Sequence, residues 1–134
     1  MIIAMVLAAM SSAGTAHHSA PVDGQWVNPS KSVVIKIGPC GQVHCGTVTW
    51  ASDKAKQDAL KGTKHLVGYH LLTNLKNNGS HQWKGKIFVP DQNMTASAKL
   101  NLEGHDHLKV TGCGLMGTIC RSQTWTRAHH HPHA

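Results

Sequence analysis

Ser32-Val33-Val34-Ile35-Lys36-Ile37 is the stretch that decides the fold of this 134-residue chain. Successive side chains of an extended strand point to opposite faces. The odd-numbered residues of the stretch are all apolar, which is the pattern of a half-buried strand. Gly38–His44 has the composition of a turn, and Cys45–Trp50 follows as a second strand with Val48 and Trp50 on one side. The sequence therefore predicts that the folded part begins with a β-hairpin.

Short strands and turns continue to the end of the chain. Asn77-Asn78-Gly79-Ser80 is a strong turn signal, flanked by runs of residues that favour strands. Asp53–Lys64 is different because it is polar and only weakly amphipathic, so we expect a surface connection with one or two helical turns. The further expected strands are Leu66–Leu75, Trp83–Val89, Thr95–Leu102, Leu108–Gly112 and Ile119–Arg127.

Gly24-Gln25-Trp26 opens the folded part and brings the total to about eight strands, joined mostly by short turns. Regular spacing of this kind is typical of a sandwich or an up-and-down barrel. We expect an all-β fold, a single antiparallel up-and-down β-barrel of about eight strands. The interior of such a barrel is filled by side chains or is just wide enough for one small ligand.

The charge of the chain limits its partners only loosely. Lys and Arg outnumber Asp and Glu by 13 to 6, which gives a formal net charge of +7. This excess permits attraction to nucleic acid, acidic ligands or anionic lipid. The lysines are scattered along the sequence, and it contains no nucleic-acid recognition motif or arginine-rich stripe. We expect no nucleic-acid partner, and at most a weak attraction to anionic membrane surfaces.

The first residues resemble an export signal. Ile2–Met10 is an apolar run, and the small residues of Ser11–Ala16 suit a signal-peptidase site. The run is too short to span a bilayer, which takes about 20 residues. No Lys or Arg precedes it, which indicates a truncated signal, and a buried first element of the fold is the alternative. We expect a bacterial periplasmic or secreted protein with four segments: residues 1–16 as signal peptide, 17–23 as N-terminal arm, 24–127 as barrel domain, and 128–134 as a disordered His-rich tail.

Four cysteines fit an exported domain. They are Cys40, Cys45, Cys113 and Cys120. An even number in a small exported domain predicts disulfides, because the periplasm is oxidising. Four cysteines allow three connectivities, and sequence alone does not choose among them. The simplest is local, with Cys40 bonded to Cys45 and Cys113 to Cys120, each closing a short loop between two strands.

Several short motifs occur in a recognisable order. They are Gly24-x-Trp26, Val33-Val34-Ile35, Cys45-Gly46, Trp50, Leu66-Val67-Gly68, Trp83-Lys84-Gly85-Lys86-Ile87, Pro90-Asp91, Leu108–Cys113 and Cys120–Arg127. Their order and spacing resemble the bacterial family catalogued as domain of unknown function 2147. The closing Arg-Ser-Gln-x-Trp-x-Arg run is the most specific part. The resemblance implies a small secreted protein with a lipocalin-like barrel and no assigned activity.

The same resemblance implies how one end of the barrel closes. Lipocalins carry a Gly-x-Trp motif on the first strand and a basic residue after the last one. Gly24, Trp26 and Arg127 match these roles by their positions in the chain. An arginine guanidinium over an indole face is a favourable contact of about 0.5–2 kcal/mol.

The last strand contains the best candidates for ligand contact. Arg121, Gln123 and Trp125 share one face of an extended strand. If that face points inward, the arginine can anchor a ligand headgroup such as a carboxylate. The alternative is an internal hydrogen-bond network or an outward face. Trp50 and Trp83 either line an apolar cavity or simply fill the core.

Metal binding and catalysis have less support. The chain has 12 histidines, and His129, His130, His131 and His133 would bind metal weakly, while the cysteine spacings miss the usual zinc pattern. We expect no metal site in the folded body and no cofactor. Only six residues are acidic, and no catalytic motif is present, which favours a non-enzymatic protein.

Three hypotheses remain open from the sequence. The first is a binding protein that holds a small, hydrophobic or amphipathic ligand in its barrel. The second is an envelope protein–protein interaction module whose barrel is filled. The third is a metal-handling protein that uses the histidine clusters.

Overall fold

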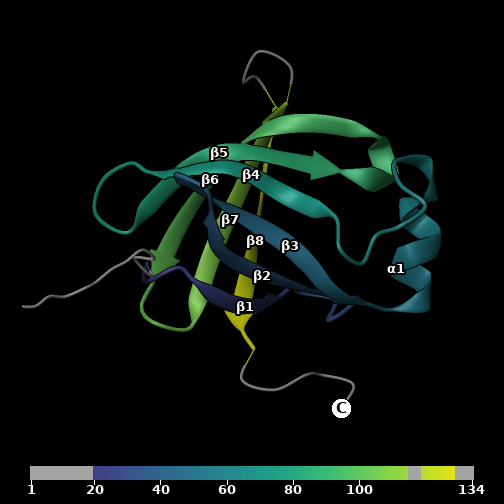
Figure 1. Cartoon of the computed structure of the whole chain (residues 1–134), viewed down its shortest axis with the longest axis horizontal. Helices are drawn as coiled ribbons and strands as arrows, with labels where there is room; N and C mark the ends of the chain where they lie inside the picture. The colour runs from purple at the N-terminus through teal and green to yellow at the C-terminus, as the bar shows by residue number, and fades with distance from the viewer. Residues whose placement is uncertain (1–19, 115–118, 129–134) are drawn as a thin grey trace, which may run out of the picture.

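Eight antiparallel strands, each paired with the next in sequence, close into a barrel in this computed structural model, which describes residues 20–114 and 119–128 (Figure 1). β1 also pairs with β8, so the sheet closes on itself. The predicted fold class, an all-β up-and-down barrel of about eight strands, is confirmed. The strands are β1 (Gly24–Val27), β2 (Val33–Cys40), β3 (Val43–Ala51), β4 (His70–Asn77), β5 (Gln82–Val89), β6 (Met94–Glu103), β7 (His107–Gly114) and β8 (Ile119–Arg127).

Alternation along the strands fills the barrel with apolar side chains. Trp83, Leu100 and Val110 lie directly opposite one another on adjacent strands, and all three are buried. Burying a large apolar side chain contributes about 1.5–3 kcal/mol, so a continuous interior of this kind drives closure of the sheet. The largest fully buried side chains are those of Trp26, Ile35, Ile37, Leu72, Leu75, Leu100, Leu108, Val22, Val34 and Val48.

The connection between β3 and β4 covers part of one end of the barrel. It contains α1 (Asp53–Asp58) and the 3-10 turn η1 (Ala59–Lys61), and α1 lies at one end of the molecule in Figure 1. Ser52 caps α1, because its Oγ accepts a hydrogen bond from the Ala55 amide at 3.1 Å. Ala59 in η1 is buried in the hydrophobic core. The connection is therefore more than the surface segment expected from its polar sequence.

Leu66 also belongs to this covering segment. It was expected to begin a strand, but β4 begins at His70. The Tyr69 amide donates to the Leu66 carbonyl at 3.0 Å, and Gly68 has a φ of +93°, so residues 66–69 form a turn. The turn lets Leu66 point into the core, where it is 5% exposed.

The opposite end is closed by Arg127. Its guanidinium carbon lies 4.3 Å from the centre of the Trp26 ring, which is fully buried. Its Nε donates to the carbonyl of His105 at 3.0 Å, and Nη1 and Nη2 donate to the carbonyls of Asp23 and Pro21 at 2.8 and 3.0 Å. One side chain thus joins the N-terminal segment, the β6–β7 turn and β8.

This contact reinforces a short seam. β1 and β8 pair at only two positions, Trp26 with Arg127 and Val27 with Thr126. Gly24 is required beside the seam, because its φ is +124° and a Cβ atom there would lie 2.8 Å from Arg127 Nη1. A glycine, a tryptophan and an arginine are therefore needed together at this end.

Both disulfides are local, as the simplest pairing predicted. Cys40 is bonded to Cys45 across the β2–β3 turn, and Cys113 is bonded to Cys120, its direct partner in the β7–β8 pair. The described residues contain no free cysteine. Each bond closes a short loop. By restricting the unfolded chain, each contributes about 2 kcal/mol to the free energy of unfolding.

We predict that Arg127→Met lowers the free energy of unfolding by about 2–3 kcal/mol, because it removes the cation–π contact and three hydrogen bonds. Arg121→Met is the matched control, because Arg121 lies on the same strand but is exposed. The control should change stability by less than about 0.5 kcal/mol. Urea unfolding followed by tryptophan fluorescence measures both, and equal effects would contradict the closing role of Arg127.

We predict that Gly85→Ala destabilises the barrel by more than about 2 kcal/mol. Its Cβ atom would lie 2.5 Å from the Thr73 carbonyl oxygen and 2.9 Å from that of Asn74, where β4 is irregular. Gly38→Ala is the control, because no atom lies within 4 Å of the new Cβ. Thermal unfolding of the two variants should separate them, and similar melting temperatures would show that the β4–β5 approach is not tight.

Candidate functional site

The inward face of β8 changes from buried to exposed along the strand. Trp125 is 4% exposed, whereas Gln123 and Arg121 are both exposed. Trp125 Nε1 donates to Gln123 Oε1 at 3.0 Å, so these two side chains lie on the same face. Arg121 is two residues further along and shares that face by strand alternation. The structure thus brings three of the five predicted ligand residues together on one strand.

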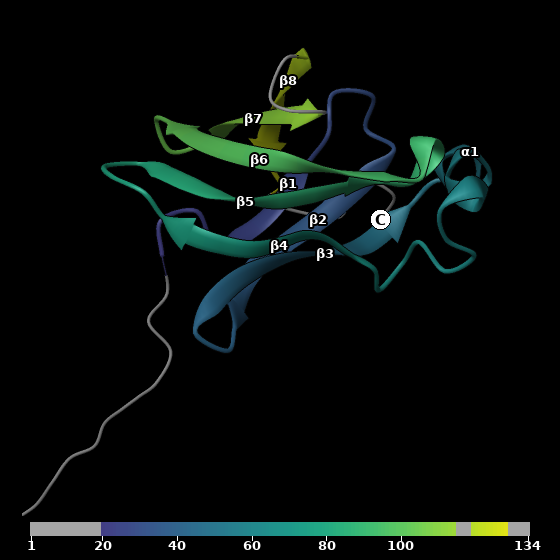
Figure 2. The ribbon, with the colours of Figure 1, turned by 90° about the horizontal axis from the view of Figure 1, so that it is seen from above.

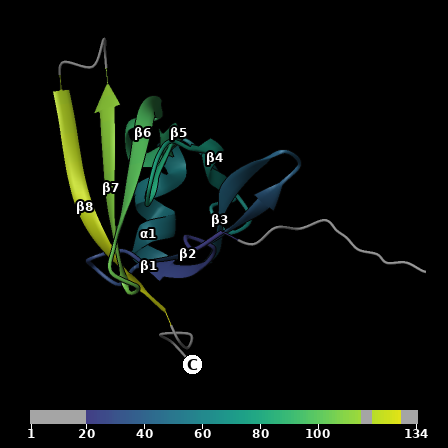
Figure 3. The same ribbon diagram turned by 90° about the vertical axis from the view of Figure 1, so that its left-hand side faces the viewer.

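The shortness of β1 explains the exposure. β7 pairs with β8 over eight positions, but β1 pairs only with Thr126 and Arg127. In Figure 3, β8 runs beside β7 for its whole length, while β1 lies near the end of β8 at Arg127. The part of β8 that carries Arg121 and Gln123 therefore extends past its β1 neighbour, and its inner face stays open to solvent.

No carboxylate among the described residues is paired with the charge of Arg121. Within residues 20–114 and 119–128 its guanidinium takes part in none of the ion pairs. A guanidinium presents a planar fork of donors that suits a carboxylate or a phosphate.

Small residues and apolar side chains lie on the inner face next to Arg121. Gly112 is its direct partner on β7, and a Cβ atom at Gly112 would lie 3.3 Å from Ile87 Cγ2. A Cβ atom at Gly114 would likewise lie 3.3 Å from Met94 Cε. The inner surface around the arginine is therefore apolar, and Arg121 and Gln123 supply its polar groups.

The two other predicted ligand residues lie elsewhere. Trp83 is 3% exposed and belongs to the core, in the same cross-strand row as Leu100, Val110 and Gln123. It fills the core and is not open to solvent.

Trp50 does not lie in the barrel interior, which corrects the expectation that it lines a cavity. The pairing of β2 with β3 shifts between Val34 and Ile35, so that Thr49 is an extra residue on β3. Val48 and Ala51 belong to the core cluster, whereas Trp50 is opposite Val34 on the outer face. The β-bulge therefore reverses the direction that simple alternation predicts for Trp50.

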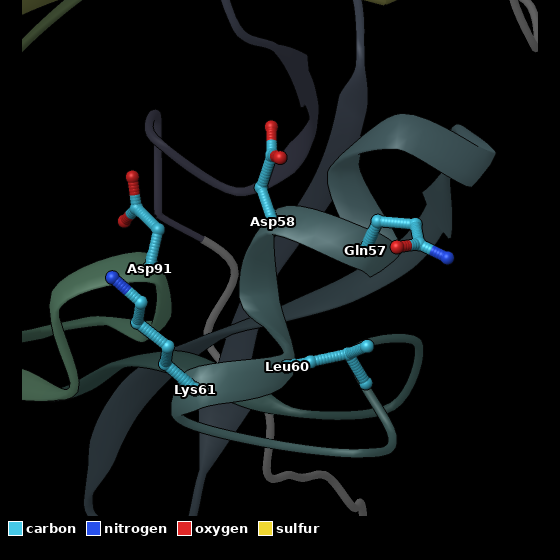
Figure 4. Close-up of a pocket in the computed structure, with 5 residues that line it drawn as sticks. All are labelled: Gln57, Asp58, Leu60, Lys61 and Asp91. Carbon is cyan, nitrogen blue, oxygen red and sulfur yellow. The ribbon is translucent and has the colours of Figure 1, made fainter.

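Two hollows lie on the outer surface beside α1. The larger is about 420 Å³ and is formed by side chains from α1, η1 and the turn η2 (Pro90–Gln92), as Figure 4 shows. The smaller is about 220 Å³ and is basic and apolar. Neither is lined by a predicted ligand residue. The linings are Gln57, Asp58, Leu60, Lys61 and Asp91 for the first, and Lys56, Lys64, His65, Leu66 and Val67 for the second.

One polar pair at the closed end was not expected from the sequence. Asp23 Oδ1 lies 3.3 Å from His44 Nε2, and both atoms are buried without another partner. Asp23 precedes β1 and His44 is on β3, so the pair links the N-terminal segment to the β2–β3 hairpin. Nothing in the sequence marks two residues 21 positions apart as neighbours, because only the pairing of β2 with both β1 and β3 brings them together.

No group of three or more His, Cys, Asp or Glu residues in the described part of the chain is placed to hold a metal ion. The predicted weak site at His129, His130, His131 and His133 lies outside the described residues, as does the predicted signal peptide. None of the helices described here is long and apolar enough to cross a membrane.

Comparisons with known proteins agree with this architecture. HP1028 from the human pathogen Helicobacter pylori, a solved structure described as belonging to the lipocalin family, matches with a TM-score of 0.62. The two chains are 18% identical, and the match covers 80% of this chain and 82% of that one. At this identity the likeness shows a lipocalin-like fold. A search of curated proteins found no match.

A family model described as "Uncharacterized protein conserved in bacteria" matches residues 24–127. These residues run from the start of β1 to the end of β8, so the match covers the whole barrel and both disulfides. It also includes Gly24, Trp26 and Arg127 at the closed end. This chain therefore belongs to the bacterial family DUF2147, and its fold is a lipocalin-like barrel.

Proposed function

We propose that this protein is a non-catalytic binding protein that holds a small amphipathic ligand, with an anionic group, at the open end of its barrel. The observation that carries the proposal is the exposed, unmatched guanidinium of Arg121 on the inward face of β8. Water solvates this exposed guanidinium in the free protein, and its planar fork of donors suits a carboxylate or a phosphate. An anionic ligand would replace that water with charge-assisted hydrogen bonds.

The neighbours of Arg121 suit such a ligand. Gln123 has its amide oxygen engaged by Trp125, which leaves its amide nitrogen for a second hydrogen bond to the ligand. Ile87 and Met94 provide apolar surface next to the glycines of β7. Small-molecule sites commonly combine an apolar lining with a few polar groups in this way. The ligand chemistry that fits is an acyl chain with a carboxylate.

The same residues support binding without catalysis. Arg121 is permanently charged, and Gln123, Ile87 and Met94 offer neither a nucleophile nor a general base. The two disulfides fit an oxidising compartment, and we place the protein in the periplasm or outside the cell.

A second candidate is a protein–protein interaction module, and the filled interior favours it. Trp26, Ile35, Leu72 and Leu108 are fully buried in the barrel interior. A ligand would therefore reach only the open end beyond Trp125. An interaction module would use its outer surface and bind no small molecule there.

A fluorescent fatty acid, dansylaminoundecanoic acid, tests the first candidate. We predict that it binds the wild-type protein with an increase in dansyl fluorescence, and that Arg121→Gln weakens binding by about tenfold or more. The reason is that a charge-assisted hydrogen bond contributes about 1.5–3 kcal/mol. Unlabelled decanoate should displace the probe.

Lys109→Gln is the matched control, because it removes one positive charge from β7, the strand paired with β8, at a side chain on the outer face. It should leave probe binding unchanged. The proposal would be rejected in favour of the interaction module if the wild-type protein does not bind the probe and native mass spectrometry detects no co-purified small molecule. Equal binding by Arg121→Gln and wild type would reject the role of Arg121.

A further inference from the structure

Five lysines that are scattered in sequence gather on one outer face of the barrel. They are on β4 to β7, which lie side by side (Figure 2). All five side chains are exposed. We call this surface the lysine face, and its members are Lys76, Lys84, Lys86, Lys99 and Lys109.

Three of these lysines lie in one row across three strands. Lys76 of β4 is directly opposite Lys84 of β5, and Lys84 is directly opposite Lys99 of β6. Strands are about 4.8 Å apart, so the side chains leave the sheet as close neighbours. Like charges directly opposite each other destabilise a sheet. The row therefore costs stability in the isolated protein, and an anionic partner would offset that cost.

The surroundings of the row do not neutralise it. Lys86 is two residues from Lys84 on the same face, and Lys109 lies on β7. None of the five lysines takes part in an ion pair within residues 20–114 and 119–128. The outward positions between them are occupied by uncharged hydrogen-bonding residues, among them Thr73, Gln82, Ser97, Asn101 and Thr111. The acidic Glu103 is opposite His107 at the far end of β6.

The lysines near α1 form a less strongly positive surface than the lysine face. Lys54 is paired with Asp58 at 2.9 Å. Lys61 lines the same hollow as Asp58 and Asp91. Four lysines of residues 54–64 thus share their surface with carboxylates, so the lysine face is the more strongly cationic of the two surfaces.

We propose that the lysine face binds the surface of an anionic lipid bilayer. Lysine is a compact point charge that suits a diffuse layer of anionic headgroups, whereas selective phosphate contact favours the arginine fork. The five cations of the face are all lysine, and Phe88, which shares the outer face of β5 with Lys84 and Lys86, is partly buried against Tyr69. Binding of single-stranded nucleic acid would call for exposed aromatic rings on which bases stack. A bilayer therefore fits the face better than a nucleic acid.

This docking is independent of the barrel ligand. The lysine face lies on the outer side of β4–β7, whereas Arg121 points to the inner side of β8. Loss of fatty-acid binding would leave docking intact, and loss of docking would leave fatty-acid binding intact.

Vesicle co-sedimentation tests the proposal. The wild-type protein should bind vesicles that contain about 30% phosphatidylglycerol and not vesicles of pure phosphatidylcholine. The triple variant Lys76→Gln, Lys84→Gln, Lys99→Gln should bind the anionic vesicles at least about tenfold more weakly. Binding of the wild type should also fall when salt is raised from about 50 to 300 mM, because exposed charges are screened.

The control is the triple variant Lys54→Gln, Lys56→Gln, Lys64→Gln, which changes the net charge equally on another surface. It should bind the anionic vesicles within about twofold of wild type. Equal losses in the two variants would show that net charge, and not the lysine face, controls binding, and would overturn the proposal. No binding of wild type to anionic vesicles, or tighter binding of a single-stranded oligonucleotide, would also overturn it.

Folding of the face variant is checked on the same samples. Its urea midpoint should equal or exceed that of wild type, because repulsion within the lysine row is reduced. A lower midpoint would contradict the premise that the row is uncompensated. The single reversal Lys84→Glu gives a second measure, because it places one acid between two lysines and should also weaken vesicle binding.

Discussion

The contact between Arg127 and Trp26 is the interaction on which the closed barrel depends. β1 and β8 share only two paired positions, which is too little to hold an eight-stranded sheet closed by backbone hydrogen bonds alone. The guanidinium supplements them by covering the indole ring and by donating to three carbonyls from two separate segments. Gly24 lets the backbone come close enough for this contact.

The short seam also creates the open region at the other end. If β1 continued beyond Val27, it would pair with the middle of β8 and cover the inner face there. The chain instead turns at Asn28, whose side-chain oxygen accepts from the amides of Ser32 and Val33, both at 2.9 Å. Arg121 and Gln123 are exposed as a result. Because β1 is short, Arg127 is needed to hold the barrel closed, and the side chain of Arg121 stays exposed to solvent.

Apolar side chains fill the interior, and Ala59 and Leu66 of the β3–β4 connection cover part of the α1 end. The inner face of β8 is exposed at Arg121 and Gln123. The ligand we propose would therefore bind near the surface, with its acyl chain near Ile87 and Met94 and its anionic group at Arg121. Trp83 faces inward but belongs to the core, so it is not part of the proposed site.

Period-two alternation, turn residues and the cysteine count were sufficient to predict an all-β barrel of about eight strands with disulfides, because these signals are local. The motif order was sufficient to identify the family. Three features depended on the tertiary structure. A β-bulge of one residue turned Trp50 outward, and alternation alone cannot reveal such an insertion. The length of β1 decided that Arg121 is exposed. Strand register collected Lys76, Lys84 and Lys99 into one row, because residues far apart in sequence become direct neighbours only when strands pair.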